Sequence, residues 1–581
     1  MRHPLALLLI FTAAVFVPVV LFGQFIWDDE LLVVGNQLVG QPGRLGELFT
    51  ADLWSTAQSD DTASNYYRPL FLLSLAMDRA LFGLSPVGHH LTSLAWHLAC
   101  VALLWRLLGR LAIDRTPRIL AASLFALHPL QLEAVAFVSA RNDSMAAAFT
   151  LAAMLLCLKR GRTILHLFPA AGLAAMAVLT KESALVIPGL YLAIHLAAPG
   201  DGRPGVLRGF LAMAAGVTAA LFLRFDLGHP LTGEDTYLGL TDTIEGSTAV
   251  ALHYLGLLLW PAGGAPTATI QNSPSLLHFA LFGGLLIAGA LIVGRRKALG
   301  GLVFAAIALA PSAWAIQHFG GLGFRYAYLP LAGISIAFAA GLEQLLSEKP
   351  LPVSATIALP ALLAASTLSM MPAWSSTEAL WRDSHEVAPS AESACGLFKA
   401  LEGSLRENPD EIRSMEARAM LRESTTRPVS PYCCLSATRW HWESTVNGGH
   451  LLEGFREVVE AGHWALDQGC PATGELLAPL AMSHAVLGEW EEAESYANMV
   501  NRDPFGFTPV VLSAAAVMRG DSSVLEAFIE SGAGDPMEIA NQVNLLTGNT
   551  NTLQEVTPDT PPEPQTSPEG EPQTSSDGEP Q

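Results

Sequence analysis

The chain has 581 residues, of which 51% are hydrophobic and only 15% are charged, and its formal net charge is −21. Soluble domains carry about a quarter charged residues, so most of this chain suits a lipid environment. The acidic balance argues against nucleic acid as a partner, because binding phosphate backbones needs a basic surface.

Long apolar stretches follow one another from the N-terminus to Met371, and polar residues concentrate after it. Stretches of roughly twenty apolar residues can cross a bilayer as helices. The sequence therefore predicts a polytopic membrane domain of residues 1–372. Its eleven predicted spans are 4–23, 86–108, 118–136, 143–158, 163–179, 183–198, 206–223, 276–294, 299–317, 326–345 and 352–371.

Lysine and arginine collect in alternate predicted loops, which indicates the sidedness of a membrane protein. We expect these clusters, together with the N-terminus, to be cytoplasmic. Another apolar run, 248–262, is predicted to be re-entrant, because a full crossing there would place the last cluster outside. The C-terminal region then faces the extracytoplasmic side. The clusters are Arg106–Arg118, Lys159–Arg162, Arg203–Arg208 and Arg295–Lys297.

Two adjacent carboxylates, Asp28 and Asp29, follow the first predicted span beside Trp27. Trp is typical of the headgroup level of a membrane, and charge near that depth is costly to desolvate, so the pair indicates a functional site. One carboxylate of a close pair, with its pKa raised by its neighbour and by burial, is suited to be a general base. The sequence does not decide which of the two is the base. The alternative is a solvated helix flank.

Other ionisable residues occur in the loops predicted on the same outer face. This one-sided distribution favours an enzyme at the membrane surface over a transporter, which more often has polar groups in mid-span and two related halves. The candidate substrate-binding residues are Arg68, His128, Glu133, Arg141, Asp143, Lys181, Glu182, Arg325 and Tyr326.

Three of these cations, Arg141, Lys181 and Arg325, are suited to hold a phosphate, because arginine forms bidentate hydrogen bonds and lysine acts as a point charge. Glu133 and Asp143 are predicted to form a second acidic cluster that orients acceptor or donor.

Several of the candidate residues also have a structural alternative. His128 before a proline is equally typical of a kinked span end. Lys181 and Glu182 are equally typical of an ion pair at a helix turn. The alternative for Arg325-Tyr326 is an ordinary interfacial anchor.

Five ordered motifs within residues 20–385 resemble those of GT-C polytopic glycosyltransferases, most of all the transmembrane and tetratricopeptide-repeat O-mannosyltransferases and their bacterial relatives. In that family the first outer loop carries an acidic motif at the active centre, and the donor is a sugar on a polyprenyl or dolichyl phosphate. The resemblance implies transfer of a sugar such as mannose to a Ser or Thr hydroxyl of a protein, with other acceptors open for bacterial members. The motifs are Phe25–Asp29 with Tyr66–Leu70, His89–Thr92, Ala126–Val135 with Ser139–Asp143, Leu179–Ser183, and Phe324–Pro330.

No pattern in the chain requires a metal ion. His89-His90 has no companion ligand at the usual spacing. A carboxylate pair that meets a phosphate nevertheless leaves Mg²⁺ or Mn²⁺ open as a cofactor.

Residues 373–545 are predicted to form an extracytoplasmic helical domain. The segment Leu487–Ala493, followed by Tyr496 and Asp503-Pro504, looks like the second part of a degenerate tetratricopeptide repeat, whose groove would hold an acceptor polypeptide or a protein partner. A generic helical bundle is the alternative. Residues 546–581 form an acidic, Pro-rich tail that cannot bury a core and is predicted to be disordered.

Four of the six cysteines, Cys395, Cys433, Cys434 and Cys470, fall in this C-terminal domain. One or two disulfides are expected if the domain faces an oxidising compartment.

The sequence thus predicts an all-α, GT-C-like membrane glycosyltransferase that contacts membrane lipids and uses a lipid-phosphate-linked sugar, with a C-terminal TPR-like domain. The expected location is a bacterial inner membrane, with the N-terminus cytoplasmic and the C-terminal domain periplasmic; an endoplasmic-reticulum equivalent is the alternative. Two rival hypotheses are a non-catalytic membrane scaffold whose TPR-like domain binds protein partners, and a transporter of a lipid-linked substrate.

Overall fold

The structure of the chain is a computed structural model. It describes residues 3–54, 66–158, 164–198, 203–229, 240–259, 296–319, 322–347, 352–407, 411–425, 438, 441–442, 445, 451–467, 470, 472–500, 506–521, 523–530 and 536–547. Within these ranges the regular elements are all helices, which confirms the predicted all-α class. The chain divides into two compact units, Met1–Arg427 and Pro428–Gln581.

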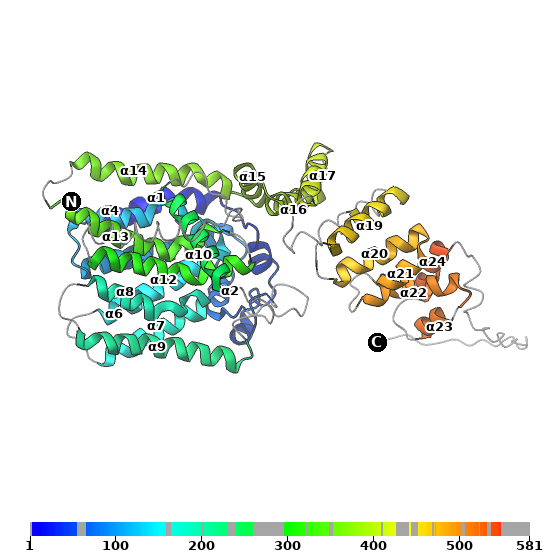
Figure 1. Ribbon diagram of the computed structural model, residues 1–581, viewed down its shortest axis with the longest axis horizontal. Helices are drawn as coiled ribbons and strands as arrows, with labels where there is room; N and C mark the ends of the chain where they lie inside the picture. The colour runs from blue at the N-terminus through cyan, green and yellow to red at the C-terminus, as the bar shows by residue number, and fades with distance from the viewer. Residues whose placement is uncertain are drawn as a thin grey trace, which may run out of the picture. The chain divides into compact units, whose positions relative to one another are not determined.

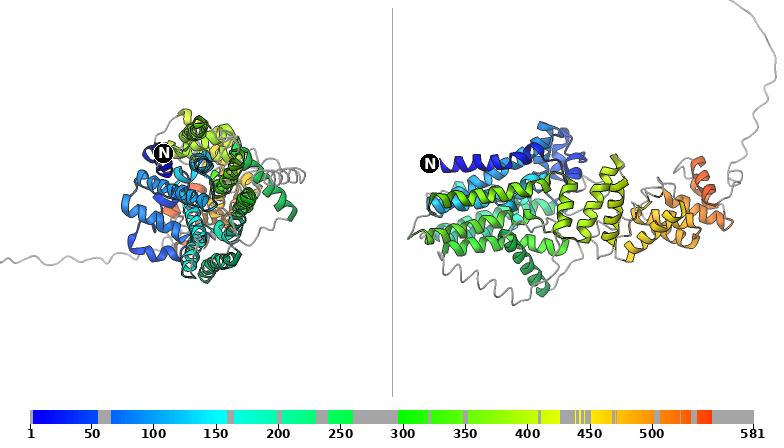
Figure 2. Two further views of the ribbon diagram at one scale, coloured as in Figure 1. Left: turned by 90° about the vertical axis from the view of Figure 1, so that its left-hand side faces the viewer. Right: turned by 90° about the horizontal axis from the view of Figure 1, so that it is seen from above.

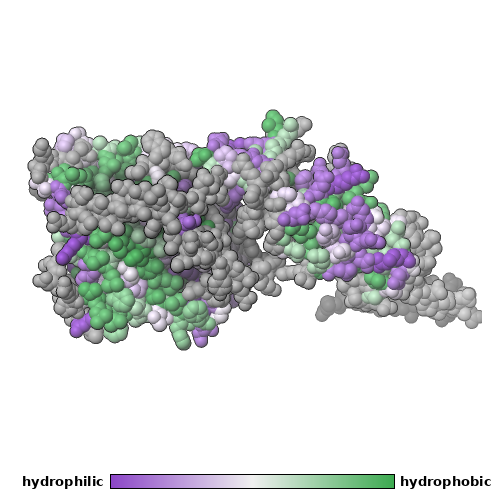
Figure 3. All heavy atoms as spheres, viewed as in Figure 1, coloured by the Kyte–Doolittle hydropathy of each residue, from purple (hydrophilic) through white to green (hydrophobic). Residues whose placement is uncertain are grey.

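The first unit contains a bundle in which most helices run side by side along one direction (Figures 1 and 2). Hydrophobic residues cover much of the coloured surface of this bundle (Figure 3). Helices occupy the predicted spans apart from 276–294, which lies outside the described residues. The helices are α1 (Pro4–Phe22), α3 (Pro86–Arg110), α4 (Arg115–Leu127), α6 (Arg141–Cys157), α7 (Leu167–Thr180), α8 (Ile187–Ala197), α9 (Arg203–Asp226), α10 (Leu240–Leu259), α12 (Arg296–Phe319), α13 (Tyr328–Leu345) and α14 (Val353–Met370).

The predicted count of eleven spans is not confirmed. By length and composition, six helices in the described part of the chain could cross a membrane: α1, α3, α9, α12, α13 and α14. A seventh is the pair formed by α4 and the segment Pro129–Ala136, which is bent by 51°. Pro129 lies at this bend, where proline ends a helix because it lacks a backbone N–H. The other predicted spans that lie within the described residues form shorter helices, such as α7 with 14 residues.

The run predicted to be re-entrant, 248–262, contributes the second half of α10, and α10 packs against α12. α10 is not among the candidate spans identified in the described residues.

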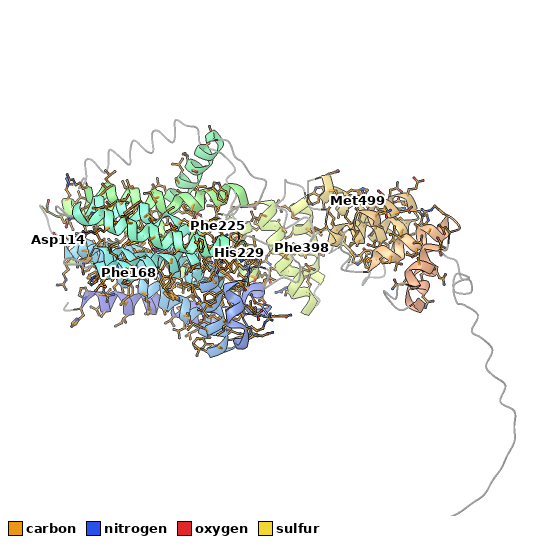
Figure 4. The ribbon with its side chains drawn as sticks, turned by 90° about the horizontal axis from the view of Figure 1, so that it is seen from below. Asp114, Phe168, Phe225, His229, Phe398 and Met499 are labelled. Carbon is orange, nitrogen blue, oxygen red and sulfur yellow. The ribbon has the colours of Figure 1, made fainter. Side chains whose placement is uncertain are left out.

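The loops of the bundle gather at two opposite ends, and Figure 4 labels Asp114 at one end and His229 at the other. At the first end, Lys297 Nζ lies 2.6 Å from Glu343 Oε2 and donates to the carbonyl of Ala112 at 3.0 Å. The Asp114 N–H donates to Glu343 Oε1 at 3.1 Å. The basic clusters near Arg110 and Arg296 therefore share one end, as the sequence predicted.

At the opposite end, the first loop folds into η1 (Glu30–Val34), η2 (Pro42–Phe49) and α2 (Pro69–Phe82), drawn in blue in Figure 1. α2 buries Phe71, Leu72 and Leu75 against this loop, while Met77 and Leu81 are exposed. This small core fixes the loop that follows α1.

The same end receives the short broken elements η3 (Pro129–Gln131), α5 (Glu133–Ala136), η4 (Val138–Ala140), η6 (Glu182–Val186) and η8 (Phe324–Ala327). The first unit is completed after α14 by η9 (Met371–Trp374), α15 (Thr377–Val387), α16 (Ala391–Glu407) and α17 (Glu411–Thr425). The compact unit thus extends beyond residue 372, the predicted end of the apolar region.

The second unit is helical, and its visible face is largely hydrophilic (Figure 3). The segment predicted to be repeat-like forms an α20–α21 hairpin, which turns at Gly488 with φ of +80° and buries Ala485 against Ala493 and Ala497. A generic bundle also uses such a hairpin, so the tetratricopeptide assignment stays a prediction. The helices are α19 (Leu451–Asp467), α20 (Gly474–Leu487), α21 (Trp490–Met499), α22 (Phe507–Met518), α23 (Ser523–Glu530) and α24 (Pro536–Thr547).

Two cysteines of the C-terminal region, Cys395 and Cys470, are disulfide-bonded. Cys100 and Cys157 of the bundle are buried and free. The predicted presence of disulfides in this region is therefore confirmed. The predicted tail lies almost wholly outside the described residues.

Candidate active site

The acidic doublet lies on a tight turn after α1. Trp27 has a φ of 51°, a left-handed conformation that bulky residues rarely adopt. The turn is closed by the Asp29 N–H, which donates to the Ile26 carbonyl at 3.0 Å, and the Trp27 ring stacks on Phe137 with centroids 5.6 Å apart. Such strain costs about 1–3 kcal/mol and persists only where surrounding contacts enforce it.

Asp29 is an anchor of this turn. Its side chain is completely buried. Oδ1 accepts from the N–H and the hydroxyl of Ser139 at 2.7 and 2.6 Å, and Oδ2 accepts from the N–H groups of Ile26 and Val138, each at 3.2 Å. Burial raises the pKa of Asp29 to about 7, against the opposing effect of these hydrogen bonds. Both oxygens are already occupied, so this carboxylate is poorly placed to accept a substrate proton.

Asp28 has a different environment. It is half-buried, and its carboxylate accepts no hydrogen bond from the described residues. Burial raises the pKa of Asp28 to about 6, with the Arg325 guanidinium opposing the rise and Glu133 adding to it. A carboxylate with free lone pairs, partial access and a pKa just below neutrality suits a general base. The tertiary structure thus separates two residues that the sequence left equivalent.

Arg325 enters the site from η8 at the start of α13. Its guanidinium forms an ion pair with Glu133, whose other oxygen accepts from the Arg325 backbone N–H at 2.9 Å. The guanidinium also lies over the rings of Trp27 and Tyr326, 5.7 and 5.1 Å from their centroids. Glu133 is fully buried whereas Arg325 keeps 18% side-chain exposure. Glu133 therefore positions Arg325, and Arg325 is the member that a ligand can reach.

Lys181 pairs with Asp143, with Nζ 2.6 Å from both carboxylate oxygens. The same ammonium lies 5.3 Å from the centroid of the Tyr326 ring, so Tyr326 contacts two cations, Lys181 and Arg325. Glu133 and Asp143, expected to form one acidic cluster, instead pair with separate cations. Tyr326 holds the two cations in a fixed relation.

Glu182 binds two arginines. Its Oε2 accepts from Arg68 Nε at 2.8 Å, and its Oε1 lies 3.1 Å from Arg224 Nη1. The alternative of a Lys181–Glu182 ion pair is therefore wrong, because each residue pairs with a distant partner. Arg68 and Glu182 keep 14% and 19% side-chain exposure, so both border a surface that a ligand can approach.

Arg141 does not join this group of cations. Its side chain has no exposure, and Nη1 lies 2.6 Å from Asp78 Oδ2. The remaining nitrogens donate to Ser93 Oγ and to the His89 carbonyl at 3.0 and 2.7 Å. These bonds fasten α6 to α2 and α3. The predicted contact of Arg141 with a phosphate is withdrawn, because no part of its guanidinium is open to a ligand.

His128 has the structural role. Its Nδ1 accepts from the Leu130 N–H at 3.2 Å, and Nε2 lies 3.2 Å from the Leu258 carbonyl of α10. It therefore caps η3 and ties the bend after α4 to α10. It is almost fully buried, which argues against direct contact with a substrate.

Two residues that sequence reasoning missed also support the site. Arg224, at the end of α9, is the second cation on Glu182. Tyr254 of α10 donates its hydroxyl to the Gly323 carbonyl at 2.7 Å, directly before η8. Neither carries a local signal, because the contact that links each of them to the site is with a residue far away in the chain.

The sequence left Mg²⁺ or Mn²⁺ open as a cofactor, but the described residues offer no preformed set of ligands for either ion. The described residues contain no group of three or more His, Cys, Asp or Glu side chains arranged for a metal ion. Glu133, Asp143 and Glu182 are each engaged with a cation. A hard cation prefers several oxygen ligands, which this arrangement does not offer together.

Comparisons with known proteins find protein O-mannosyl-transferases. TMTC3 of Mus musculus is 32% identical over 179 residues, which is 29% of this chain and 19% of the relative. F38B6.6 of Caenorhabditis elegans is 29% identical over 216 residues, 35% of this chain and 31% of the relative. TMTC4 of Homo sapiens is 30% identical over 195 residues, 29% of this chain and 26% of the relative.

The matched segments therefore span less than a third of the length of each of these relatives. No protein-family model matches the chain, and no solved structure matches it. The similarity confirms the resemblance to protein O-mannosyl-transferases that the motifs predicted.

Proposed function

We propose that this TMTC-like chain is an integral membrane glycosyltransferase of the GT-C type. It moves a sugar, most simply mannose, from a polyprenyl or dolichyl phosphate to a hydroxyl acceptor such as a Ser or Thr of a protein. The relatives are protein O-mannosyl-transferases, which supports mannose and protein as the two substrates. The observation that carries the proposal is the placement of Asp28 near Arg325, where its half-buried carboxylate accepts no hydrogen bond from the described residues.

Asp28 is the general base of the proposed reaction. The acceptor oxygen forms a bond to the anomeric carbon, and its proton passes to the Asp28 carboxylate. The bond from the anomeric carbon to the phosphate oxygen breaks, and the electron pair leaves with the lipid phosphate. With a pKa of about 6, Asp28 is ionised in about 90% of molecules at pH 7 and can take this proton.

The surrounding cations match this chemistry. Arg68, Lys181, Arg224 and Arg325 form ion pairs with Glu133, Asp143 and Glu182. When Asp28 gains the proton, it loses its negative charge as the departing phosphate gains one, and pre-placed cations stabilise such a charge most effectively.

Arg325 and Lys181 are the proposed phosphate contacts. Arg325 offers a planar fork of donors and Lys181 a compact charge, and both are held by buried acids and by Tyr326. Arg68 borders the same surface. A lipid-anchored phosphate would reach this end of the bundle from the membrane, because its sugar stays at the interface.

The extracytoplasmic location of the site is also proposed. The disulfide-bonded Cys395 and Cys470 follow the last apolar helix, and disulfides persist in oxidising compartments. A bacterial inner membrane with a periplasmic site meets this condition, as does an endoplasmic-reticulum lumen. The C-terminal helical region would there meet acceptor proteins.

The test uses the purified full chain in detergent with radiolabelled polyprenyl-phosphate mannose and a Ser/Thr-containing peptide. We expect labelled peptide and released polyprenyl phosphate in equal amounts, and co-purified lipid phosphate in the mass spectrum. If the wild-type chain neither binds nor consumes the donor, the proposal is overturned. Partner binding through the C-terminal region, unchanged by Asp28→Asn and without transfer, would establish the scaffold alternative.

A further inference from the structure

The segment that follows the last apolar helix contacts both sides of the candidate site. Thr377, the first residue of α15, accepts a hydrogen bond at its Oγ1 from the Trp27 N–H, at 3.0 Å. Trp381, one turn later, meets the Trp27 ring edge to face with centroids 5.3 Å apart. In η9, Trp374 packs on Phe324 with centroids 6.1 Å apart.

Each contacted residue is the chain neighbour of a residue with a proposed chemical role. Trp27 precedes Asp28 and has the strained backbone of the turn. Phe324 precedes Arg325, whose own N–H is held by Glu133. A displacement of η9 or α15 would therefore move the proposed base and the proposed phosphate contact relative to each other.

The position of α15 is set in turn by α16. Trp381 is almost fully buried, and a Cβ added to Gly396 of α16 would lie 2.0 Å from Cδ2 of the indole. The ring therefore rests directly on the α16 backbone. In close packing of this kind, even one added methyl group must displace its neighbour.

We propose that residues 371–381, named here the positioning strap, hold Trp27-Asp28 and Arg325 in the geometry required for transfer. Thr377 and Trp381 are the positioning residues, and Gly396 leaves the space that fixes the place of the Trp381 indole. This inference rests on the proposed function and deepens it. The C-terminal helices then have a role in catalysis that is separate from any binding of acceptor proteins.

The experiment compares two alanine substitutions on one helix, in the full chain. Gly396→Ala pushes the Trp381 ring, while Gly403→Ala adds the same methyl group where nothing lies within 4 Å. We expect Gly396→Ala to lower kcat roughly ten- to a hundredfold with little change in donor KM, because small misplacements of reacting groups have effects of this size. Gly403→Ala should keep the wild-type kcat.

A second pair of variants tests the hydrogen bond from the Trp27 N–H to Thr377 Oγ1. Thr377→Val removes the acceptor of the Trp27 N–H, and Thr377→Ser retains it. Hydrogen exchange of the peptide that contains Trp27 should be roughly fivefold faster in Thr377→Val, the effect of one lost hydrogen bond, and normal in Thr377→Ser. The rate of sugar transfer should fall in Thr377→Val and stay at the wild-type value in Thr377→Ser.

Hydrogen exchange does not depend on sugar transfer, so it separates the two proposals. If exchange at Trp27 and kcat are both unchanged in Thr377→Val and Gly396→Ala, the positioning strap is refuted although the proposed function stands. If exchange responds but the wild-type chain transfers no sugar, the contact between α15 and the turn is established and the proposed function fails. Equal loss of activity in Gly403→Ala would also refute the strap, because it would show a general effect on α16.

Discussion

The two aspartates of the doublet should respond differently to the same chemical change. Asp28→Asn replaces a carboxylate that accepts no hydrogen bond from the described residues, so the turn should keep its structure. Removal of a general base typically lowers kcat about 10²–10⁴-fold. Asp29→Asn replaces one of two accepting oxygens by an NH₂ group that faces N–H donors. Two buried donors then lose their partner at about 1–3 kcal/mol each, so the variant should lose about 2–6 kcal/mol of stability.

The assay measures two quantities on each purified variant. Turnover of polyprenyl-phosphate mannose reports on chemistry, and the midpoint of thermal unfolding in detergent reports on the fold. We expect Asp28→Asn to be inactive with a wild-type midpoint, and Asp29→Asn to have a clearly lower midpoint. Ser384→Ala is a suitable control, because the bond that the described residues give this buried α15 hydroxyl is to the Leu380 carbonyl of its own helix.

One result would refute the reasoning directly: wild-type turnover in Asp28→Asn. If Asp29→Asn were instead inactive at an unchanged midpoint, the roles of the two residues would be reversed. Full activity in both variants would remove the doublet from the mechanism.

Three other predictions follow from the same structure. Because the base must be ionised and burial raises the pKa of Asp28 to about 6, kcat/KM should fall about tenfold per pH unit below that value and level off above it; a flat profile from pH 5 to 8 would exclude Asp28. Arg141→Met should lower the free energy of unfolding by about 3–5 kcal/mol, since it leaves Asp78 buried without its cation, and thermal unfolding and donor KM should show lost stability with an unchanged KM. In intact cells, a membrane-impermeant maleimide should label Cys395 and Cys470 only after reduction; labelling that also requires permeabilisation would place them in the cytoplasm.

Local chemistry was enough to predict several features of the fold. Apolar runs such as 4–23 and 86–108 become α1 and α3, because burying unpaired backbone groups in lipid forces these runs to be helical. The alternating basic clusters correctly placed Arg110 and Arg296 at one end. The count of crossings could not be fixed in this way, since several of the helices are too short or too bent to cross a bilayer by length alone.

Sequence was sufficient to predict which residues lie at one common end of the bundle, because that depends on where each apolar run stops. It therefore found Asp28, Asp29, Lys181 and Arg325. The environment of each of them is known only from the folded structure, because the partners of an ionisable side chain lie far away along the chain. Ser139 and Val138 donate hydrogen bonds to Asp29 and none to the Asp28 carboxylate. Arg141 forms a buried ion pair with Asp78. Thr377 accepts a hydrogen bond from Trp27, 350 positions earlier in the chain, at the turn beside the proposed base.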